Sequence, residues 1–277
     1  MSEQDTDNTA QAAQVAALGF PSPLLGQDNL RLRVLYNKDG LFALERPARV
    51  LNGPHPWHVN LPNIADAINE QLRNDKPEML RLGLDPKNPV QAIFHTDPGI
   101  AGVALFASGA EATAKARNAF GSSIWRLRFE IVATGGPAED EAECDLPVAR
   151  HNNLPVALVS ITTGKKTSTR FRRLERLGKF NIWEAETNYY RADQLPVHAV
   201  ELGIRICGEG RYAHESPVFM SRLKRGWTGD REFELPLYEA PSAYLAELTL
   251  EDGTSIKADP PKKLANQIKQ IRKRFGQ

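Results

Sequence analysis

The sequence predicts an α+β domain built on a mixed, mostly antiparallel sheet flanked by helices. Two turn signals indicate antiparallel hairpins, because residues 37–40 (NKDG) and 252–253 (DG) each separate two short apolar runs. Residues 64–74 and 109–121 carry apolar side chains at helical spacing. Residues 124–135 alternate apolar and polar side chains, as a half-buried strand does. Strands and helices therefore succeed one another along one chain.

The remaining elements follow from local signals. The first hairpin ends before Pro47, and a helix over 194–203 ends on Gly203, the residue type that helices favour for left-handed termination. An exposed acidic loop is expected over 136–145. The other expected elements are strands in 156–164, 168–178 and 179–188, with turns at Gly164 and Gly178, and a basic helix over 262–276.

The chain divides into two unequal parts. Residues 1–30 are acidic and polar, then alanine-rich, then interrupted by Pro21 and Pro23, which predicts a flexible N-terminal arm. No linker or internal repeat divides residues 31–277, which we interpret as a single domain.

Composition limits the class of protein. Among 277 residues, 41% are hydrophobic and 25% are charged, which is typical of a globular domain, and the net charge of +1 means that any affinity for nucleic acid must come from a local basic surface. Cys144 and Cys207 are distant and form no CxxC pair, which favours a reducing compartment and argues against a disulfide framework. The sequence shows no signal peptide and no apolar run of about 18 residues, so a cytoplasmic location is expected.

Two stretches place reactive side chains at turns or helix starts. In 94–99 (FHTDPG), His95 and Asp97 precede an apolar strand, where partial burial would tune the carboxylate for nucleophilic or acid/base chemistry. The same residues also suit a simple turn. Residues 189–198 (YYRADQLPVH) contain the start of a helix, whose free amides suit phosphate, although a capped helix with a solvated arginine explains them equally.

Basic residues gather in two clusters although the net charge is close to zero. This asymmetry favours a surface that binds a polyanion, with a solvated charged face as the alternative. The clusters are Lys165, Lys166, Arg170, Arg172, Arg173 and Arg176, and Lys262, Lys263, Lys269, Arg272, Lys273 and Arg274. His55 and His58 could form a metal pair, but no third ligand is near in the sequence, so no metal site is expected.

Five stretches resemble, in the same order, the motifs of the RluA-like family of RNA pseudouridine synthases. The resemblance extends from about residue 32 to about residue 264. The stretches are LFALERPARV, FHTDPGIAGVALFA, FEIVATG, YRADQLPVH and LGIRICGEGRY. The last two match the family without a gap, at Arg191, Gln194, Val197, His198, Leu202, Gly203, Ile206, Gly208 and Tyr212.

The resemblance implies roles for individual residues. Asp97 is similar to the catalytic aspartate, and Phe129 to the tyrosine that stacks against the target base. The resemblance further implies that Arg191, His95 and Gln194 contact the substrate. The residues expected to contact the RNA backbone are Lys165, Lys166, Arg170, Arg172 and Arg173.

The chain also departs from the family pattern. His95 and Pro98 replace the arginines that flank the catalytic aspartate, and Ile100-Ala101 replaces a Thr-Ser pair. Pro196 replaces the second arginine of the helix motif, which pairs with the aspartate in the family. A nearby cation keeps a buried carboxylate ionised, so Asp97 is expected to be a poorer nucleophile unless Arg191, His95 or Arg205 takes over this task.

The resemblance implies a pseudouridine synthase fold with a central RNA-binding cleft. It also implies an isomerase that converts specific uridines of rRNA or tRNA to pseudouridine, needs no cofactor and no metal, and acts as a cytoplasmic monomer. The changes at Pro98 and Pro196 leave a second hypothesis open, in which a catalytically silent family member serves as an RNA-binding module.

Overall fold

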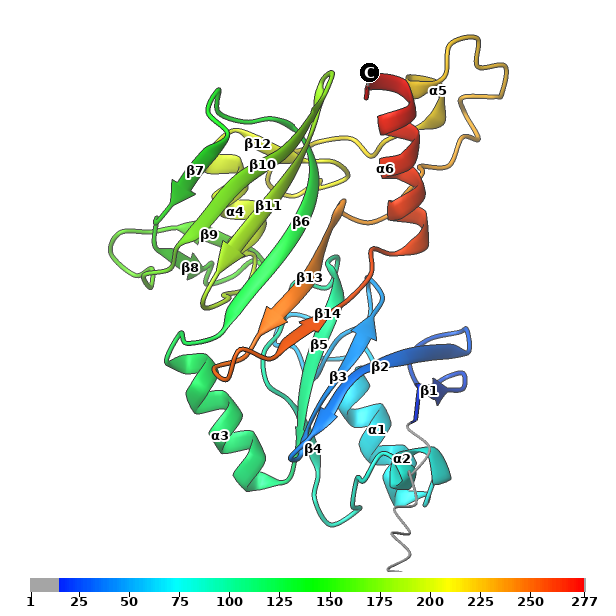
Figure 1. The fold of residues 1–277 in the computed structure, drawn as a ribbon, viewed down its shortest axis with the longest axis vertical. Helices are drawn as coiled ribbons and strands as arrows, with labels where there is room; N and C mark the ends of the chain where they lie inside the picture. The colour runs from blue at the N-terminus through cyan, green and yellow to red at the C-terminus, as the bar shows by residue number, and fades with distance from the viewer. Residues whose placement is uncertain (1–14, 277) are drawn as a thin grey trace, which may run out of the picture.

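The computed structural model describes residues 15–276 (Figure 1). Its strands are β1 (Ala17–Phe20), β2 (Leu30–Lys38), β3 (Leu41–Arg46), β4 (Val90–Ala92), β5 (Ala101–Ser108), β6 (Arg126–Gly135), β7 (Glu141–Cys144), β8 (Val148–Arg150), β9 (Ala157–Val159), β10 (Thr169–Leu177), β11 (Phe180–Thr187), β12 (Ile204–Ile206), β13 (Ala243–Thr249) and β14 (Ser255–Lys257). Its helices are α1 (Ile64–Arg73), α2 (Pro77–Arg81), α3 (Ala110–Gly121), α4 (Gln194–Glu201), α5 (Met220–Leu223) and α6 (Lys262–Phe275). The predicted α+β class is confirmed.

Most described strands form one sheet in the order β1-β2-β3-β5-β13-β6-β11-β10-β7. Strands β4, β12 and β14 pair with β5, β6 and β13, while β8 and β9 form a separate hairpin. The pairing of β13 with β5 is parallel and the other strand pairs of the described sheet are antiparallel, so the sheet is mixed and mostly antiparallel.

Strand β13 joins two halves of this sheet. Figure 1 shows β1 to β5 on one side of β13 and β6, β7 and β10 to β12 on the other. On the β5 side the parallel register consists of Tyr244 opposite Ala101 and Leu245 opposite Gly102. We call this short β5–β13 pairing the seam.

Helices cover both faces of the sheet because its strands alternate. Ala104 and Phe106 of β5 belong to a buried cluster with α1 and α2, whereas Val103 and Leu105 belong to a second cluster with α3 and α4. Helix α6 buries Leu264 and neighbouring residues in a third cluster, against β11 and β13. The site described below lies on the face that α3 and α4 cover.

Local chemistry explains the predicted elements. The turn between β2 and β3 places Asp39 and Gly40 at φ values of 52° and 76°, as a two-residue hairpin turn requires. Helix α1 begins after Asn63, whose side-chain oxygen accepts a hydrogen bond from the Asp66 amide at 2.9 Å. The expected helices over 64–74 and 109–121 are therefore confirmed.

Two segments differ from expectation. Residues 17–20, assigned to the flexible arm, form β1, because Leu18 and Phe20 are buried against the α1 side of the sheet. Residues 1–14 of that arm lie outside the described residues. The acidic loop over 136–145 contains β7, which places Glu143 opposite Arg170 of β10. Opposite charges on facing strands stabilise such a pair, so its acidity does not prevent strand formation.

Candidate active site

Asp97 lies in the loop between β4 and β5, at the floor of a cavity of about 830 Å³. A buried arginine holds this loop from beneath. The Arg46 guanidinium is 1% exposed and donates to the Thr96 hydroxyl at 2.6 Å and to the Asp97 carbonyl at 3.1 Å. It also donates to the Val50 carbonyl at 2.6 Å, so the guanidinium fixes the backbone of the loop and leaves the Asp97 carboxylate to other partners.

The chain enters β5 through Gly102, which has a φ of +113°. A Cβ atom at this position would overlap the backbone of Leu245 in β13. Glycine therefore permits the close approach of the two strands at the seam, directly beyond the Asp97 turn.

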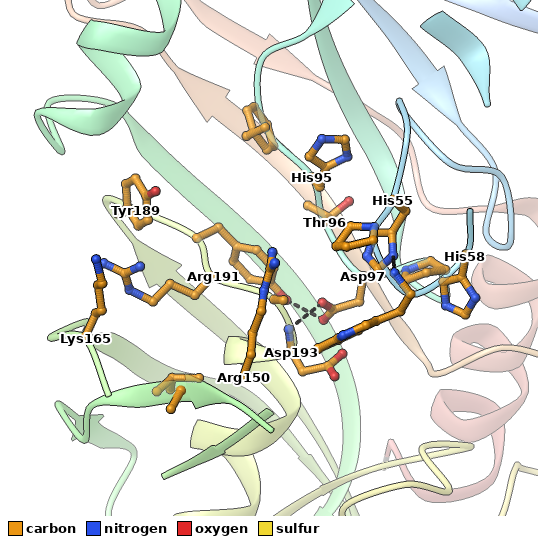
Figure 2. Close-up of a pocket in the computed structure, with 18 of the residues that line it drawn as sticks. His55, His58, His95, Thr96, Asp97, Arg150, Lys165, Tyr189, Arg191 and Asp193 are labelled. Carbon is orange, nitrogen blue, oxygen red and sulfur yellow. Dashed lines mark hydrogen bonds between the residues drawn. The ribbon is translucent and has the colours of Figure 1, made fainter. Parts of the chain in front are cut away.

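Two hydrogen bonds hold the Asp97 carboxylate, and both come from the other half of the sheet. The Tyr190 hydroxyl donates to Oδ2 at 2.6 Å, and the backbone amide of Asp193 donates to Oδ1 at 2.7 Å (Figure 2). Asp193 precedes α4 in the left-handed region, with a φ of 55°, and this turn directs its amide at Asp97.

Burial sets the charge of Asp97. Its side chain is nine-tenths or more buried, and this desolvation, together with the nearby Asp193 carboxylate, raises the pKa of Asp97 to about 7. The hydrogen bonds from Tyr190 and the Asp193 amide act in the opposite direction, because they stabilise the charged form. Asp97 therefore exchanges its proton near neutral pH, which suits a group that acts in both protonation states.

A cation neutralises the second carboxylate. Arg211 binds Asp193 through both terminal nitrogens, at 2.6 and 3.1 Å, and the Tyr212 hydroxyl donates to Asp193 at 2.6 Å. Glu209 accepts hydrogen bonds from the backbone amides of Arg211 and Tyr212, which fixes the loop that carries them. Arg211 is thus a charge that acts on Asp97 through Asp193.

None of the three basic groups considered as a replacement for the family arginine pairs with Asp97 in the described residues. Within residues 15–276, no lysine or arginine forms an ion pair with the Asp97 carboxylate. Arg205 pairs with Glu215 at 3.4 Å, and the Arg191 guanidinium lies over the Tyr189 ring, 4.8 Å from its centroid. Desolvation and the neighbouring His55 lower the pKa of His95, so its ring is neutral at neutral pH. Neutral donors have taken the place of a cation at Asp97.

Positive charge surrounds the cavity. The basic residues that line it are Arg117, Arg150, Lys165, Arg191 and Arg211, against the two carboxylates Asp97 and Asp193. Figure 2 shows His55 and His58 on one side of Asp97, and Tyr189, Lys165 and Arg191 on the other. The rings of His55 and His58 are 5.0 Å apart, and the described residues contain no set of three histidine, cysteine or acidic side chains arranged to hold a metal ion.

Phe129 and Gln194 do not line this cavity. Phe129 is fully buried and packs against Tyr190, with ring centroids 5.2 Å apart, so it has no free face for a base. Gln194 is also fully buried, accepting a hydrogen bond from the Arg191 amide and donating to Thr187. Both residues support the 189–194 segment from behind, and their expected substrate contacts are absent from this structure of residues 15–276.

The basic cluster at 165–176 separates into two groups. Lys165 lines the cavity, whereas Lys166 and Arg170 line a second hollow beside it. The other two expected RNA contacts lie outside both cavities: Arg172 is exposed and pairs with Glu184 at 2.8 Å, and the buried Arg173 pairs with Asp140 at 2.9 Å. Burial therefore leaves Arg173 no open surface for RNA, whereas the contact expected of Arg172 stays a prediction.

Sequence reasoning did not select Tyr190, Asp193 or Arg211. Tyr190 stands directly before Arg191 in the stretch that resembles the family, and its only sequence signal is an ionisable hydroxyl just before a predicted helix.

Comparison with known proteins identifies similar sequences. No family model matches the chain. It is 25% identical over 195 residues to the dual-specificity RNA pseudouridine synthase RluA of Yersinia pestis, covering 69% of this chain and 87% of the relative. It is 23% identical over 193 residues to an uncharacterized RNA pseudouridine synthase of Synechocystis, covering 69% of this chain and 57% of that protein. The chain spans 60% of the length of a further relative from Chlorobaculum parvum.

Solved structures show the same fold. The human RNA pseudouridylate synthase domain containing 4 aligns with a TM-score of 0.61 at 13% identity, over 86% of this chain and 92% of that chain. The corresponding human domain containing 1 aligns with a TM-score of 0.53 at 14% identity, over 87% and 94%. The chain is thus similar to RluA-like RNA pseudouridine synthases at 25% identity. The expected pseudouridine synthase fold is confirmed.

No described helix combines the length and the apolar character needed to cross a membrane.

Proposed function

We propose that this protein is an RNA pseudouridine synthase in which Asp97 is the catalytic carboxylate. The observation that carries the proposal is the placement of Asp97: a buried carboxylate with two directed donors, at the floor of a cavity with a basic rim. A cavity of about 830 Å³ has the size of a small-molecule site and accommodates a single nucleotide, so a uridine must leave its stack to reach the carboxylate.

The reaction is an isomerisation and its atoms balance without an oxidant. The bond between uracil N1 and the ribose C1′ breaks, the base turns, and a bond forms between C5 and C1′. C5 releases a proton and N1 takes one up. Asp97 promotes the first cleavage, either as a nucleophile at C1′ or as a base at the sugar, and its raised pKa suits a group that later returns a proton.

Tyr189 replaces Phe129 as the proposed stacking surface for the target base. The Tyr189 ring lines the cavity, and Phe120 supports it in a stacked arrangement with centroids 4.7 Å apart. A supported ring loses little freedom on binding, and stacking tolerates any base. Arg150, Lys165 and Arg191 then bind the sugar–phosphate backbone at the rim, as phosphate contacts position a nucleic acid.

The proposed substrates are uridines of rRNA or tRNA, and the proposed location is the cytoplasm. The Yersinia relative is named a dual-specificity RNA pseudouridine synthase, and a relative in Nitrosomonas europaea, 25% identical over 190 residues, is named a ribosomal large subunit pseudouridine synthase D. We further propose that the protein acts as a monomer without cofactor or metal.

The test compares purified wild-type protein with Asp97→Asn on rRNA and tRNA that lack pseudouridine, with pseudouridine mapped chemically at each position. We expect product from the wild type and none from Asp97→Asn, while both bind RNA. Asp259→Asn is the matched control, because Asp259 is exposed and pairs with Arg33 outside the cavity. RNA binding without product from the wild type would instead identify a silent RNA-binding module and contradict the proposal.

A further inference from the structure

A second cavity, of about 490 Å³, adjoins the first. The two share the residues Gly121, Tyr189 and Arg191. Its other lining residues come from the 166–170 segment, the end of β11 and the turn after α3; those used below are Lys166, Thr167, Arg170, Glu143 and Glu186. An extended ligand that leaves the first cavity over Arg191 can therefore continue into the second.

Cationic side chains outnumber carboxylates in the second cavity, with Lys166, Arg170 and Arg191 against Glu143 and Glu186. Within residues 15–276, Lys166 and Arg170 form no ion pair, whereas Arg172 on the same strand pairs with Glu184. The two carboxylates offset part of this charge, because Glu143 and Glu186 both lie opposite Arg170 on the neighbouring strands. Glu186 also pairs with Arg126 at 3.6 Å. The remaining charge of this hollow is positive, which favours an anion.

Tyr189 and Arg191, which line both cavities, form the ridge between them. Phe94, Phe120 and Tyr189 form a continuous stack, with successive centroids 5.0 and 4.7 Å apart, and the Arg191 guanidinium lies over the last ring. Arg191 Nε and Thr167 Oγ1 are buried, and neither has a hydrogen-bond partner within the part of the chain that the structure describes. Both atoms can donate a hydrogen bond, so an acceptor oxygen in the adjoining hollow is a suitable partner for them.

We propose that the second cavity binds the nucleotide next to the target uridine in a single-stranded stretch of RNA. Its phosphate binds Lys166 and Arg170, and Arg191 on the ridge contacts the backbone between the two nucleotides. The choice of RNA as the ligand rests on the proposed function, whereas the anion site rests on the charges and unpaired polar atoms of this hollow.

The experiment measures whether the loss of protein charges and the loss of individual phosphate charges have additive effects on RNA binding. The probe is a fluorescent nine-nucleotide RNA with one central uridine among cytidines, made with ordinary linkages or with neutral methylphosphonate linkages on both sides of the uridine. Equilibrium binding is measured by anisotropy for the wild type, for Lys166→Ala/Arg170→Ala and for the control Arg172→Ala. Circular dichroism verifies that the exposed substitutions leave the fold intact.

For the wild type, we expect the neutral linkages to weaken binding about tenfold, the effect of about 1.4 kcal/mol. The double variant binds the ordinary RNA about tenfold more weakly and shows little further loss with the neutral RNA. For the double variant, the slope of log binding constant against log salt concentration becomes shallower by about 0.7 for each lost phosphate contact. Arg172→Ala behaves as the wild type.

Two results would overturn the proposal. In the first, the neutral linkages weaken RNA binding equally in the wild type and in the double variant. In the second, Arg172→Ala loses as much RNA affinity as the double variant, which would indicate a general electrostatic effect. Product mapping decides the proposed function separately, because the coupling of charges to phosphates is measured by binding alone.

Discussion

Replacing Tyr190 by phenylalanine removes one of the two hydrogen bonds to the Asp97 carboxylate and keeps the ring that packs against Phe129. A hydrogen bond to a charged group contributes about 1.5–3 kcal/mol, and one pKa unit corresponds to about 1.4 kcal/mol. Because the hydroxyl stabilises the ionised form, its loss raises the pKa of Asp97 by about one to two units. If the carboxylate is the reactive form, activity at pH 7 falls by about five- to fiftyfold.

The assay is kcat/KM for pseudouridine formation between pH 5.5 and 9.5, since this quantity reports the ionisations of the free enzyme. The acidic limb of the profile moves to higher pH in Tyr190→Phe, and the rate at high pH stays close to that of the wild type. Tyr238→Phe is the control, because Tyr238 is also a buried tyrosine but its hydroxyl has no partner within residues 15–276. A limb that stays in place, or moves to lower pH, would refute the reasoning.

Two further predictions concern stability. The pKa of Asp97 is raised in the folded state, so the native protein retains a proton that the unfolded chain loses, and stability from this group falls as pH rises from about 4 to about 7. The wild type should therefore lose stability between pH 5 and pH 8, whereas Asp97→Asn should not. The urea-unfolding free energy of Asp97→Asn minus that of the wild type should rise by about 3 kcal/mol from pH 5 to pH 8. The same difference at both pH values would contradict this. Gln194→Ala, which removes hydrogen bonds to Thr187 and Arg191 in a buried site, should lower the urea-unfolding free energy by about 2–4 kcal/mol. A loss of activity with unchanged stability would instead return Gln194 to a direct role at the substrate.

Local patterns predicted the elements and the place of Asp97, because turns and strand periodicity depend on neighbouring residues. Gly40 and Gly253, both at positive φ, mark the two predicted hairpin turns. Arg173 shows a signal that was available and unused: it lies two residues after the buried Phe171, so strand alternation already directs it inward.

The partners of Asp97 could not be predicted in this way. Tyr190 and Asp193 are 93 and 96 residues from Asp97 in the sequence, and no periodicity connects segments so far apart. The burial of Phe129 is visible from its strand pattern, but which ring lies in front of it depends on the docking of the 189–194 segment. The assignment of Asp97 as the catalytic aspartate stays a prediction, whereas the structure shows that Phe129 and Gln194, the residues expected around it, are buried behind the 189–194 segment.

The hydrogen bonds of the site depend on the seam between β5 and β13, where the two halves of the sheet meet. Asp97 precedes β5 in one half of the sheet, whereas its two donors precede α4 in the other, and Gly102 lets the halves approach closely. The carboxylate therefore has its two donors only while the two halves of the sheet are associated. The desolvation that raises the pKa of Asp97 opposes that same association, and the apolar clusters on both faces of the sheet offset it. Transient opening at the seam would therefore hydrate the carboxylate and silence the site before the rest of the fold is lost.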